Sequence, residues 1–431
     1  MFADLRQHGN TRWVYDVLLR TSLFWMISER RNWRRKFQEV VRVWTAEDDQ
    51  NESLSFRGFL KAVHRAYRVM TERMIGRLRR VMLDVAPGLR RIAGRDVFAV
   101  DGTSLELPRT LANQQFFCGD NVDIANESGS ECSWKLTPQM HLTTLWHVGL
   151  ALPWDWRAAH GDASERNDLR EMVASLPENA LVVGDAGFVG YGLWEAVLAE
   201  NADFVFRVGS NVHLIQGLEP CGKRDDLVWC WPQDARCADR PPRLLRLVKT
   251  TLGDTDAYLV TNVLEPEDLS DADVVSIYEA RWGIEVFYRG LKQTFSRRRL
   301  KGRMAESALA ELHLSMLSLC MLHLMGLLES SEIRESPPSL PALSTIRLLD
   351  AVRDAISQPE LHPQEDRSLP HHLRVAHLDQ YPRKGSKRSR RYPRQNKPKQ
   401  CGSPVIRAPS PREQRKLETL IRKGIHQPSA V

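Results

Sequence analysis

The chain has few cysteines, and they follow no spacing typical of disulfide-rich or zinc-binding proteins. Its 431 residues include seven Cys, an odd number scattered over the whole length. Small secreted domains that depend on disulfides are much richer in Cys, and zinc knuckles need two Cys separated by two residues. We therefore expect a reducing cytosolic environment without a disulfide framework. A zinc site built from His213, Cys221, Cys230 and Cys237 is a minor alternative.

Long hydrophobic runs are also scarce, and no signal peptide pattern opens the chain. Residues 308–328 are apolar enough to raise the question of a membrane span. However, Glu311, His313 and His323 interrupt this segment, and the sequence contains no second candidate. A charged or polar residue is costly at the centre of a bilayer, so we expect a buried core helix here.

Acidic residues are almost missing from the C-terminal end, which makes the charge distribution uneven. Residues 383–431 contain 15 Lys and Arg against 2 acids, and residues 1–92 contain 19 against 10. Because the whole chain carries only +7, the region between them is net acidic. Basic ends around an acidic centre are typical of a polyanion-binding protein with a carboxylate metal site. For residues 1–92, an ordinary solvated surface explains the charge equally well.

The length predicts two to three domains, and the sequence pattern suggests where they lie. Residues 1–92 read as a helical N-terminal region that could contact DNA. The best candidates for that contact are Arg30, Arg31, Trp33, Arg34, Arg35 and Lys36.

Alternating strand and helix patterns over residues 93–210 predict the first part of an α/β core. Frequent Pro, Gly and Trp in residues 211–256 predict a β-rich insertion, after which residues 257–330 complete the core. Residues 331–382 read as a C-terminal helical region. Residues 383–431 read as a basic tail, which we expect to be disordered until it meets an anion.

Two aspartates stand in the same local pattern. Asp101 and Asp185 each follow a buried-type apolar run and precede a small residue. Metal and phosphate ligands of open α/β sheets gather at the carboxyl ends of strands, where a small residue lets a substrate approach. Carboxylates from two such strands, joined by a third acid, would suit Mg²⁺ or Mn²⁺.

The third acid comes from residues 275–298, which contain no Pro and predict one continuous helix. Tyr278, Arg281, Glu285 and Lys292 stand at offsets 0, 3, 7 and 14, which return to one face at about 3.6 residues per turn. Arg289 extends this row. The alternative is ordinary surface pairing between Glu285 and its cationic neighbours, worth a few tenths of a kcal/mol.

The segments DGTSLEL, GDAGFVGYGLW and YEARWGIEVFYRGLK resemble, in order, the three catalytic blocks of the DDE transposases of bacterial insertion sequences. The last segment is similar to the Y-R-E-K signature of family four. The resemblance covers roughly residues 50–330. It implies an RNase H-like catalytic core interrupted by a β-rich insertion, with a helical N-terminal domain and a basic disordered C-terminal tail.

The resemblance also implies roles for individual residues. Catalysis and the binding of two Mg²⁺ (or Mn²⁺) ions would fall to Asp101, Asp185 and Glu285. Contacts with DNA would fall to Tyr278, Arg281, Arg289 and Lys292. The expected protein is a cytoplasmic, nucleoid-associated bacterial transposase that acts on double-stranded DNA. It would cut at the ends of its insertion sequence and join them to target DNA, as a dimer on paired ends.

Two other functions remain open. A nuclease of the same fold would share the acids but would not join strands. A domesticated DNA-binding protein would keep the fold and lose the chemistry, although the presence of all three acids and the complete signature argues against it.

Overall fold

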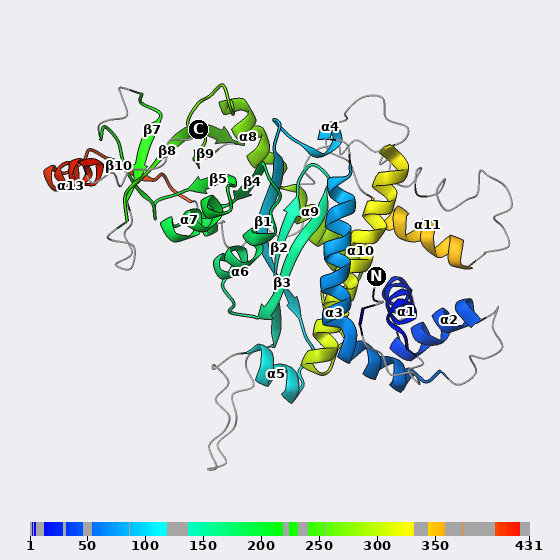
Figure 1. Ribbon diagram of the computed structural model, residues 1–431. Coiled ribbons are helices and arrows are strands. Elements are labelled where there is room, and N and C mark those ends of the chain that lie inside the picture. The colour runs from blue at the N-terminus through cyan, green and yellow to red at the C-terminus, as the bar shows by residue number, and fades with distance from the viewer. Residues whose placement is uncertain are drawn as a thin grey trace, which may run out of the picture. The chain divides into compact units, whose positions relative to one another are not determined.

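The computed structural model describes residues 2, 4–5, 13–28, 32–45, 54–85, 87–118, 137–218, 224–231, 240–253, 255–331, 344–357, 373 and 401–422 (Figure 1). It is a mixed α/β structure with two compact units. The first unit comprises residues 1–90, 102–163 and 285–381, and the second comprises residues 91–101, 164–284 and 382–431. These units do not follow the ranges read from the sequence, and the domain boundaries given above stay predictions.

The N-terminal part of the first unit is helical, with α1 (Tyr15–Ile27), α2 (Trp33–Thr45), α3 (Phe56–Leu83) and α4 (Pro87–Arg90). The long helix α3 begins after Ser55, whose side chain accepts a hydrogen bond from the Gly58 N–H. Its buried side chains recur every three or four residues, so one stripe of α3 faces the core against α10.

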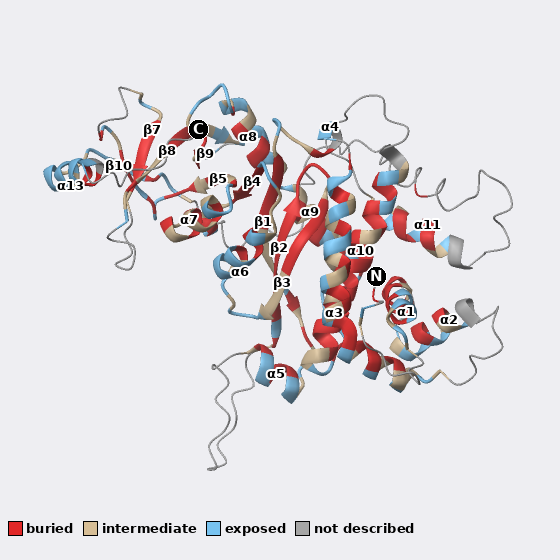
Figure 2. Ribbon diagram, in the orientation of Figure 1, coloured by how far each residue is buried: buried red, intermediate tan, exposed pale blue. Residues whose placement is uncertain are grey.

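Helix α10 (Ala305–Ser331) is the centre of the first unit and is buried nearly all round (Figure 2). By length and composition alone it could cross a membrane, but 83% of its most apolar stretch is buried inside the protein. Its polar residues have partners that explain their presence. Glu311 accepts hydrogen bonds from the Lys301 and Gly302 N–H groups, and His313 accepts one from the Trp156 indole. The expected core helix is therefore what the structure contains.

The remaining elements of the first unit frame this helix. They are α5 (Leu111–Phe117), β2 (Gln139–His147), β3 (Leu152–His160), α9 (Gly283–Arg289), the π-helical turn η6 (Gly290–Thr294) and α11 (Thr345–Ser357). Strands β2 and β3 pair antiparallel, and β2 neighbours β1 (Asp96–Glu106) in the sheet order. The boundary between the two units crosses β1 after Asp101 and crosses α9 before Glu285.

The second unit is built on a sheet in the order β10-β6-β7-β8-β9-β5-β4-β1. Its strands are β4 (Ala180–Gly184), β5 (Asp203–Val208), β6 (His213–Ile215), β7 (Leu227–Cys230), β8 (Arg243–Leu252), β9 (Thr255–Thr261) and β10 (Val405–Arg407). Strands β1, β4 and β5 run parallel, as do β6 and β10, and the other neighbouring pairs are antiparallel. The range 211–256 thus adds three strands to this sheet.

The second unit also contains six helices among its described residues. They are α6 (Glu165–Met172), η3 (Val173–Ser175), η4 (Ala186–Phe188), α7 (Tyr191–Ala199), α8 (Asp271–Ala280) and α13 (Pro411–Arg422). Of these, η4 and α7 connect the parallel strands β4 and β5. Residues Leu181, Val182 and Val183 of β4 are completely buried. A parallel strand covered on both faces is expected to be apolar throughout, as this one is.

The C-terminal region corrects the prediction of a disordered tail over its whole length. Residues 401–422 fold, because β10 pairs with β6 and α13 buries Leu417 against Ile215, Leu218 and Trp229. Helix α13 starts with a capping box, in which the Glu413 N–H donates to the Ser410 side chain and the Ser410 N–H donates to the Glu413 carboxylate. Residues 382–400, which contain most of the basic run, lie outside the described residues.

The N-terminal basic cluster needs a correction as well. Lys36 is only 5% exposed, and its ammonium group donates to the carbonyl oxygens of Ser28 (2.6 Å) and Trp25 (3.4 Å). Burial lowers the pKa of Lys36 to about 7. Lys36 therefore cannot contact DNA in this structure. Arg34 and Arg35 are exposed, and the first two arginines of the cluster lie outside the described residues.

Candidate active site

Asp101 and Asp185 are carried by neighbouring parallel strands of the second unit. The register pairs Ala99 of β1 with Val183 of β4. Asp101 and Asp185 each stand two residues after this pair, and Asp185 lies just beyond the end of β4. Because adjacent strands lie about 4.8 Å apart, we expect the two carboxylates to lie near each other. Both aspartates are partly exposed, although the strand residues before them are buried.

The two positions differ in one respect from the sequence expectation. Strand β4 ends at Gly184, as expected, but β1 continues past Asp101 to Glu106. The burial of β1 changes at Asp101, because five buried residues give way to three partly exposed ones. Asp101 is thus a mid-strand residue at the edge of the core.

The residues around Asp185 fix its position. A side chain on Gly184 would lie 2.8 Å from the Phe206 ring, so only glycine fits at the end of β4. Oδ1 of Asp185 accepts a hydrogen bond from the Gly187 N–H (2.8 Å) and caps η4. Nε of Arg166, from α6, donates to the Gly187 carbonyl oxygen (2.6 Å). Small residues are therefore needed on both sides of Asp185. Gly184 leaves room for the Phe206 ring, and Gly187 lets its backbone N–H reach the Asp185 carboxylate.

The segment 275–298 is not the single helix expected from its sequence. Helix α8 ends at Ala280, a short turn follows, α9 starts at Gly283, and η6 closes with a hydrogen bond from the Phe295 N–H to the Gly290 carbonyl. Neither the turn nor the π-helical segment keeps 3.6 residues per turn. The predicted single row of side chains is therefore wrong.

The signature residues divide at this break. Tyr278 is buried on α8, and the guanidinium of Arg281 lies 5.5 Å from the centre of its ring. This cation–π contact holds Arg281 in the second unit. Glu285 lies in the first turn of α9, and Arg289 is exposed at the end of that helix.

Lys292 links the signature segment to the strand that carries Asp101. Its ammonium group donates to Oγ1 of Thr103 at 2.6 Å, and both residues belong to the first unit. Thr103 stands two residues after Asp101 in β1. Since side chains alternate along a strand, Thr103 and Asp101 point to the same face. Sequence reasoning missed Thr103, and the only available signal was the DGT triplet itself.

Sequence reasoning also passed over Trp282, which follows Arg281 in the turn after α8. It is 53% exposed, which is unusual for so large a side chain. The helical spacing of the signature did not single out Trp282, because this residue lies in the turn between α8 and α9.

The described residues contain no group of three or more His, Cys, Asp or Glu side chains close enough to hold a metal ion. Asp101 and Asp185 nonetheless offer two neighbouring hard oxygen donors, which is the donor chemistry that Mg²⁺ and Mn²⁺ prefer. Glu285, the third predicted ligand, belongs to the other compact unit. For the alternative zinc site, Cys221 and Cys237 lie outside the described residues.

The Transposase DDE domain family model matches residues 92–321, which is more than half of the chain. The chain belongs to this family. The matched range contains Asp101, Asp185, Glu285 and the whole signature through Lys292.

Two individual proteins resemble this DDE transposase. The transposase InsG of insertion sequence element IS4 from Escherichia coli (strain K12) is 27% identical over 229 residues. The match covers 51% of the chain and 49% of InsG, so the chain spans about half the length of this curated relative. A piggyBac transposase, solved in a synaptic complex with hairpin DNA, aligns with 88% of this chain and 80% of its own. That alignment has 11% identity and a TM-score of 0.42.

Proposed function

We propose that this DDE transposase cleaves DNA at the ends of its insertion sequence and joins the 3′-hydroxyl ends to target DNA. The observation that carries this proposal is the pair Asp101 and Asp185 on neighbouring parallel strands within the matched family region. Both aspartates are partly exposed, and each follows a run of buried strand residues.

Asp101, Asp185 and Glu285 would hold the divalent metal ions that this chemistry needs. When bound, two such ions supply an activated attacking oxygen and a stabilised leaving oxygen. The protein's own contribution is orientation. The Gly187 N–H fixes one oxygen of Asp185, which leaves the other oxygen to bind a ligand. Arg166 holds the turn that donates this hydrogen bond.

We assign the DNA contacts to the cations of the signature segment. Lys292, held by Thr103, would place its charge on the face of β1 that carries Asp101. Arg281, held against Tyr278, presents a planar donor group suited to phosphate. Arg289 is exposed at the end of α9 and offers a further guanidinium group to a phosphate. Phosphate contacts of this kind position the scissile bond without reading the base sequence.

We further infer an RNase H-like core. Its support is the strand order, which is β3-β2-β1 in the first unit and β1-β4-β5 in the second, with β1, β4 and β5 parallel. Double-stranded DNA as the partner, a dimer on paired ends and a cytoplasmic, nucleoid-associated location belong to the same proposal.

The proposal is tested by supplying a supercoiled plasmid with the DNA that flanks the gene, a target plasmid, and Mg²⁺. We expect nicks or breaks at the element ends and covalent products that join those ends to the target. EDTA should abolish both products. Cleavage without joined products would favour the nuclease alternative, and binding of the ends without cleavage would favour a domesticated DNA-binding protein.

A further inference from the structure

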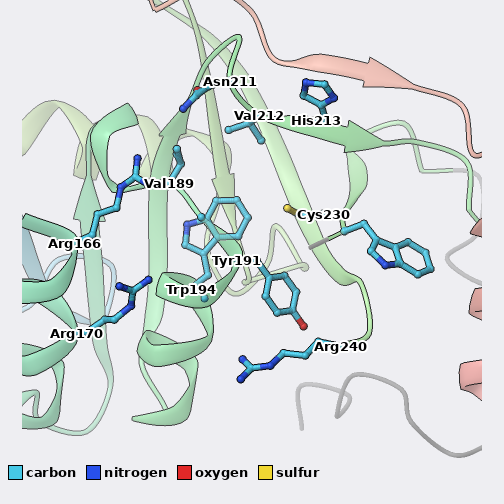
Figure 3. A pocket seen from close by; sticks show the side chains of 13 residues that line it. Arg166, Arg170, Val189, Tyr191, Trp194, Asn211, Val212, His213, Cys230 and Arg240 are labelled. Atoms are coloured by element: carbon cyan, nitrogen blue, oxygen red, sulfur yellow. The ribbon is translucent and has the colours of Figure 1, made fainter. Parts of the chain in front are cut away.

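A pocket of about 570 Å³ lies within the second unit, next to the turn that follows Asp185. Val189 and Gly190, four and five residues after Asp185, belong to its wall (Figure 3). Its volume falls in the range of small-molecule sites, about 300 to 1,000 Å³. Of the residues that line this pocket, the proposed cleavage chemistry uses only Arg166, which holds the turn after Asp185.

The lining of the pocket is strongly positive. Among the described residues, it includes Arg166, Arg170 and Arg240 and no Asp or Glu. Arg166 donates to a backbone carbonyl, and Nη1 of Arg170 donates to the side-chain oxygen of Asn167 at 2.7 Å. These partners are neutral, so the bonds leave both positive charges uncompensated. Arg240 lies 4.0 Å from Glu195, but its side chain is 53% exposed, and such pairs are weak.

Backbone donors add to this positive character. Helix α7 begins at the pocket, and its N-cap residue Gly190 provides no side-chain hydrogen bond to the first turn. The N–H groups of a helix N-terminus attract anions, because they lack partners within the helix. Tyr191 and Gly192, the first residues of α7, both line the pocket.

An unpaired indole gives an independent indication of a ligand. Trp194 lines the pocket, is 1% exposed, and its Nε1 has no hydrogen-bond partner within the described structure. Figure 3 shows this nitrogen on the side of the ring where Arg166 and Arg170 lie. A buried donor without a partner costs free energy, so a polar ligand group that reaches it would recover that loss.

Aromatic side chains complete the lining. Tyr191 and Trp231 also line the pocket. The Trp231 ring is partly buried, because it packs on the cluster around Leu417 and the ammonium group of Lys416 lies 5.4 Å from its centre. Burial raises the pKa of Tyr191 to about 12, so its phenol stays neutral and donates to the Pro241 carbonyl at 2.7 Å. Positive grooves interleaved with aromatic rings are the usual way to bind single-stranded nucleic acid, because every base has a face that can stack.

We propose that this pocket binds one nucleotide unit of single-stranded DNA. Its phosphate would lie between Arg166, Arg170 and the start of α7, and its base would lie against the aromatic wall. A base inside a duplex is stacked and paired, so it must leave the helix to enter the pocket. The proposed DNA cleavage would generate such a strand beside Asp185, and the inference rests on that proposed function for the source of its ligand.

The experiment measures binding of a fluorescein-labelled ten-nucleotide thymidine strand by fluorescence anisotropy, with EDTA present so that no cleavage occurs. The full-length variants Arg170→Ala and Arg240→Ala should each lower the affinity about tenfold, since a charge-assisted contact is lost. Arg415→Ala is the matched control, because Arg415 is an exposed arginine of the same unit on α13. It should change the affinity less than about twofold. Equal effects of Arg170→Ala and Arg415→Ala would overturn the proposal.

Competitors identify the ligand. Thymidine monophosphate should displace the labelled strand at millimolar concentration, and inorganic phosphate at the same concentration should not. Displacement by both alike would overturn the nucleotide assignment, since a simple anion site would then suffice.

Crosslinking of the unmodified protein keeps the proposal testable if a variant fails to fold. A strand with 5-iodouracil should crosslink to the peptides that contain Tyr191, Trp194 or Trp231. Crosslinks confined to other surfaces would overturn the assignment. Because neither assay requires DNA cleavage, the pocket inference can fail while the transposase proposal stands, and the reverse also holds.

Discussion

The ammonium group of Lys292 can serve the fold, through Thr103, or the substrate, through a DNA phosphate. The two roles make different predictions. If Lys292 binds phosphate, Lys292→Ala should weaken binding to the element ends by about 1.5–3 kcal/mol, whereas Thr103→Val should cost about 1 kcal/mol or less. Gel-shift titrations without metal measure both. Arg298→Ala, which removes an exposed charge of the first unit, is the control. Equal losses for Lys292→Ala and Thr103→Val would mean that the contact is structural.

Lys36 predicts a pH dependence of stability. Its pKa is about 7 in the folded protein and near 10.5 in the unfolded chain, so between these values the unfolded chain binds more protons. The contribution of Lys36 to stability should therefore rise from pH 7 to pH 10, by at most about 1.4 kcal/mol per pH unit. Below pH 7 both states are protonated, and the cost of burial is constant.

This dependence is measured as the difference in unfolding free energy between the wild type and Lys36→Met at several pH values. The difference cancels the titration of other groups. We expect it to increase in favour of the wild type as the pH rises. A difference that stays flat from pH 7 to pH 10 would show that Lys36 is solvated, in conflict with its burial.

At the level of elements, apolar strands were the most predictable part of the fold. The runs before Asp101 and Asp185 form β1 and β4 because a buried parallel strand needs a continuous apolar sequence. Core helix α10 was predictable for the same reason. The same apolar runs predicted that both aspartates would lie at the ends of strands in one sheet. They did not predict that β1 continues beyond Asp101.

The break between α8 and α9 could not be read from helical spacing. Gly283 was the only local sign of it, and a single glycine is tolerated in many helices. The π-helical turn was also unpredictable, because Gly290 packs closely against Thr345, a residue distant in the sequence, where an added side chain would lie 2.8 Å from Oγ1 of Thr345. The burial of Lys36 could not be predicted either. A run of basic residues predicts a solvent-exposed segment, although the side chain of one residue in it can still be buried.

Helix α13 shows the opposite case, in which a usable signal was overlooked. The sequence SPRE is a capping box with Pro at the first helical position. Leu417 follows at the spacing of an amphipathic helix and is buried. Counting charges over the whole C-terminal end concealed this local pattern.

Docking of α13 can be tested through Leu417. Replacing this side chain by Ala removes packing against Ile215, Leu218 and Trp229, and should destabilise the helix contact by about 2–4 kcal/mol. Hydrogen exchange should then become fast in α13 and β10 while the central sheet stays protected. Glu418→Ala, at an exposed neighbouring position, should leave exchange unchanged. Slow exchange in α13 of Leu417→Ala would contradict the packing described here.

For the whole molecule, the uneven charge predicts how DNA binding responds to salt. Nine of the seventeen residues from 383 to 399 are basic, and none is acidic. Replacing the nine by Gln should weaken binding to any DNA sequence and reduce the slope of log K against log salt by about 0.9 per lost phosphate contact. This design keeps β10 and α13, which a truncation would remove. An unchanged slope would mean that the run does not contact DNA.

The central claim is that Asp101, Asp185 and Glu285 act together on DNA while neighbouring cations hold it. The most direct test measures cleavage rate and end-binding affinity for Asp101→Asn, Asp185→Asn and Glu285→Gln on one substrate in Mg²⁺. Each should lower cleavage by about 10²-fold or more and leave end binding nearly intact, since each removes a carboxylate and no core packing. Glu106→Gln, on the same strand as Asp101, should behave as wild type. Near wild-type cleavage by any of the three variants would contradict the account.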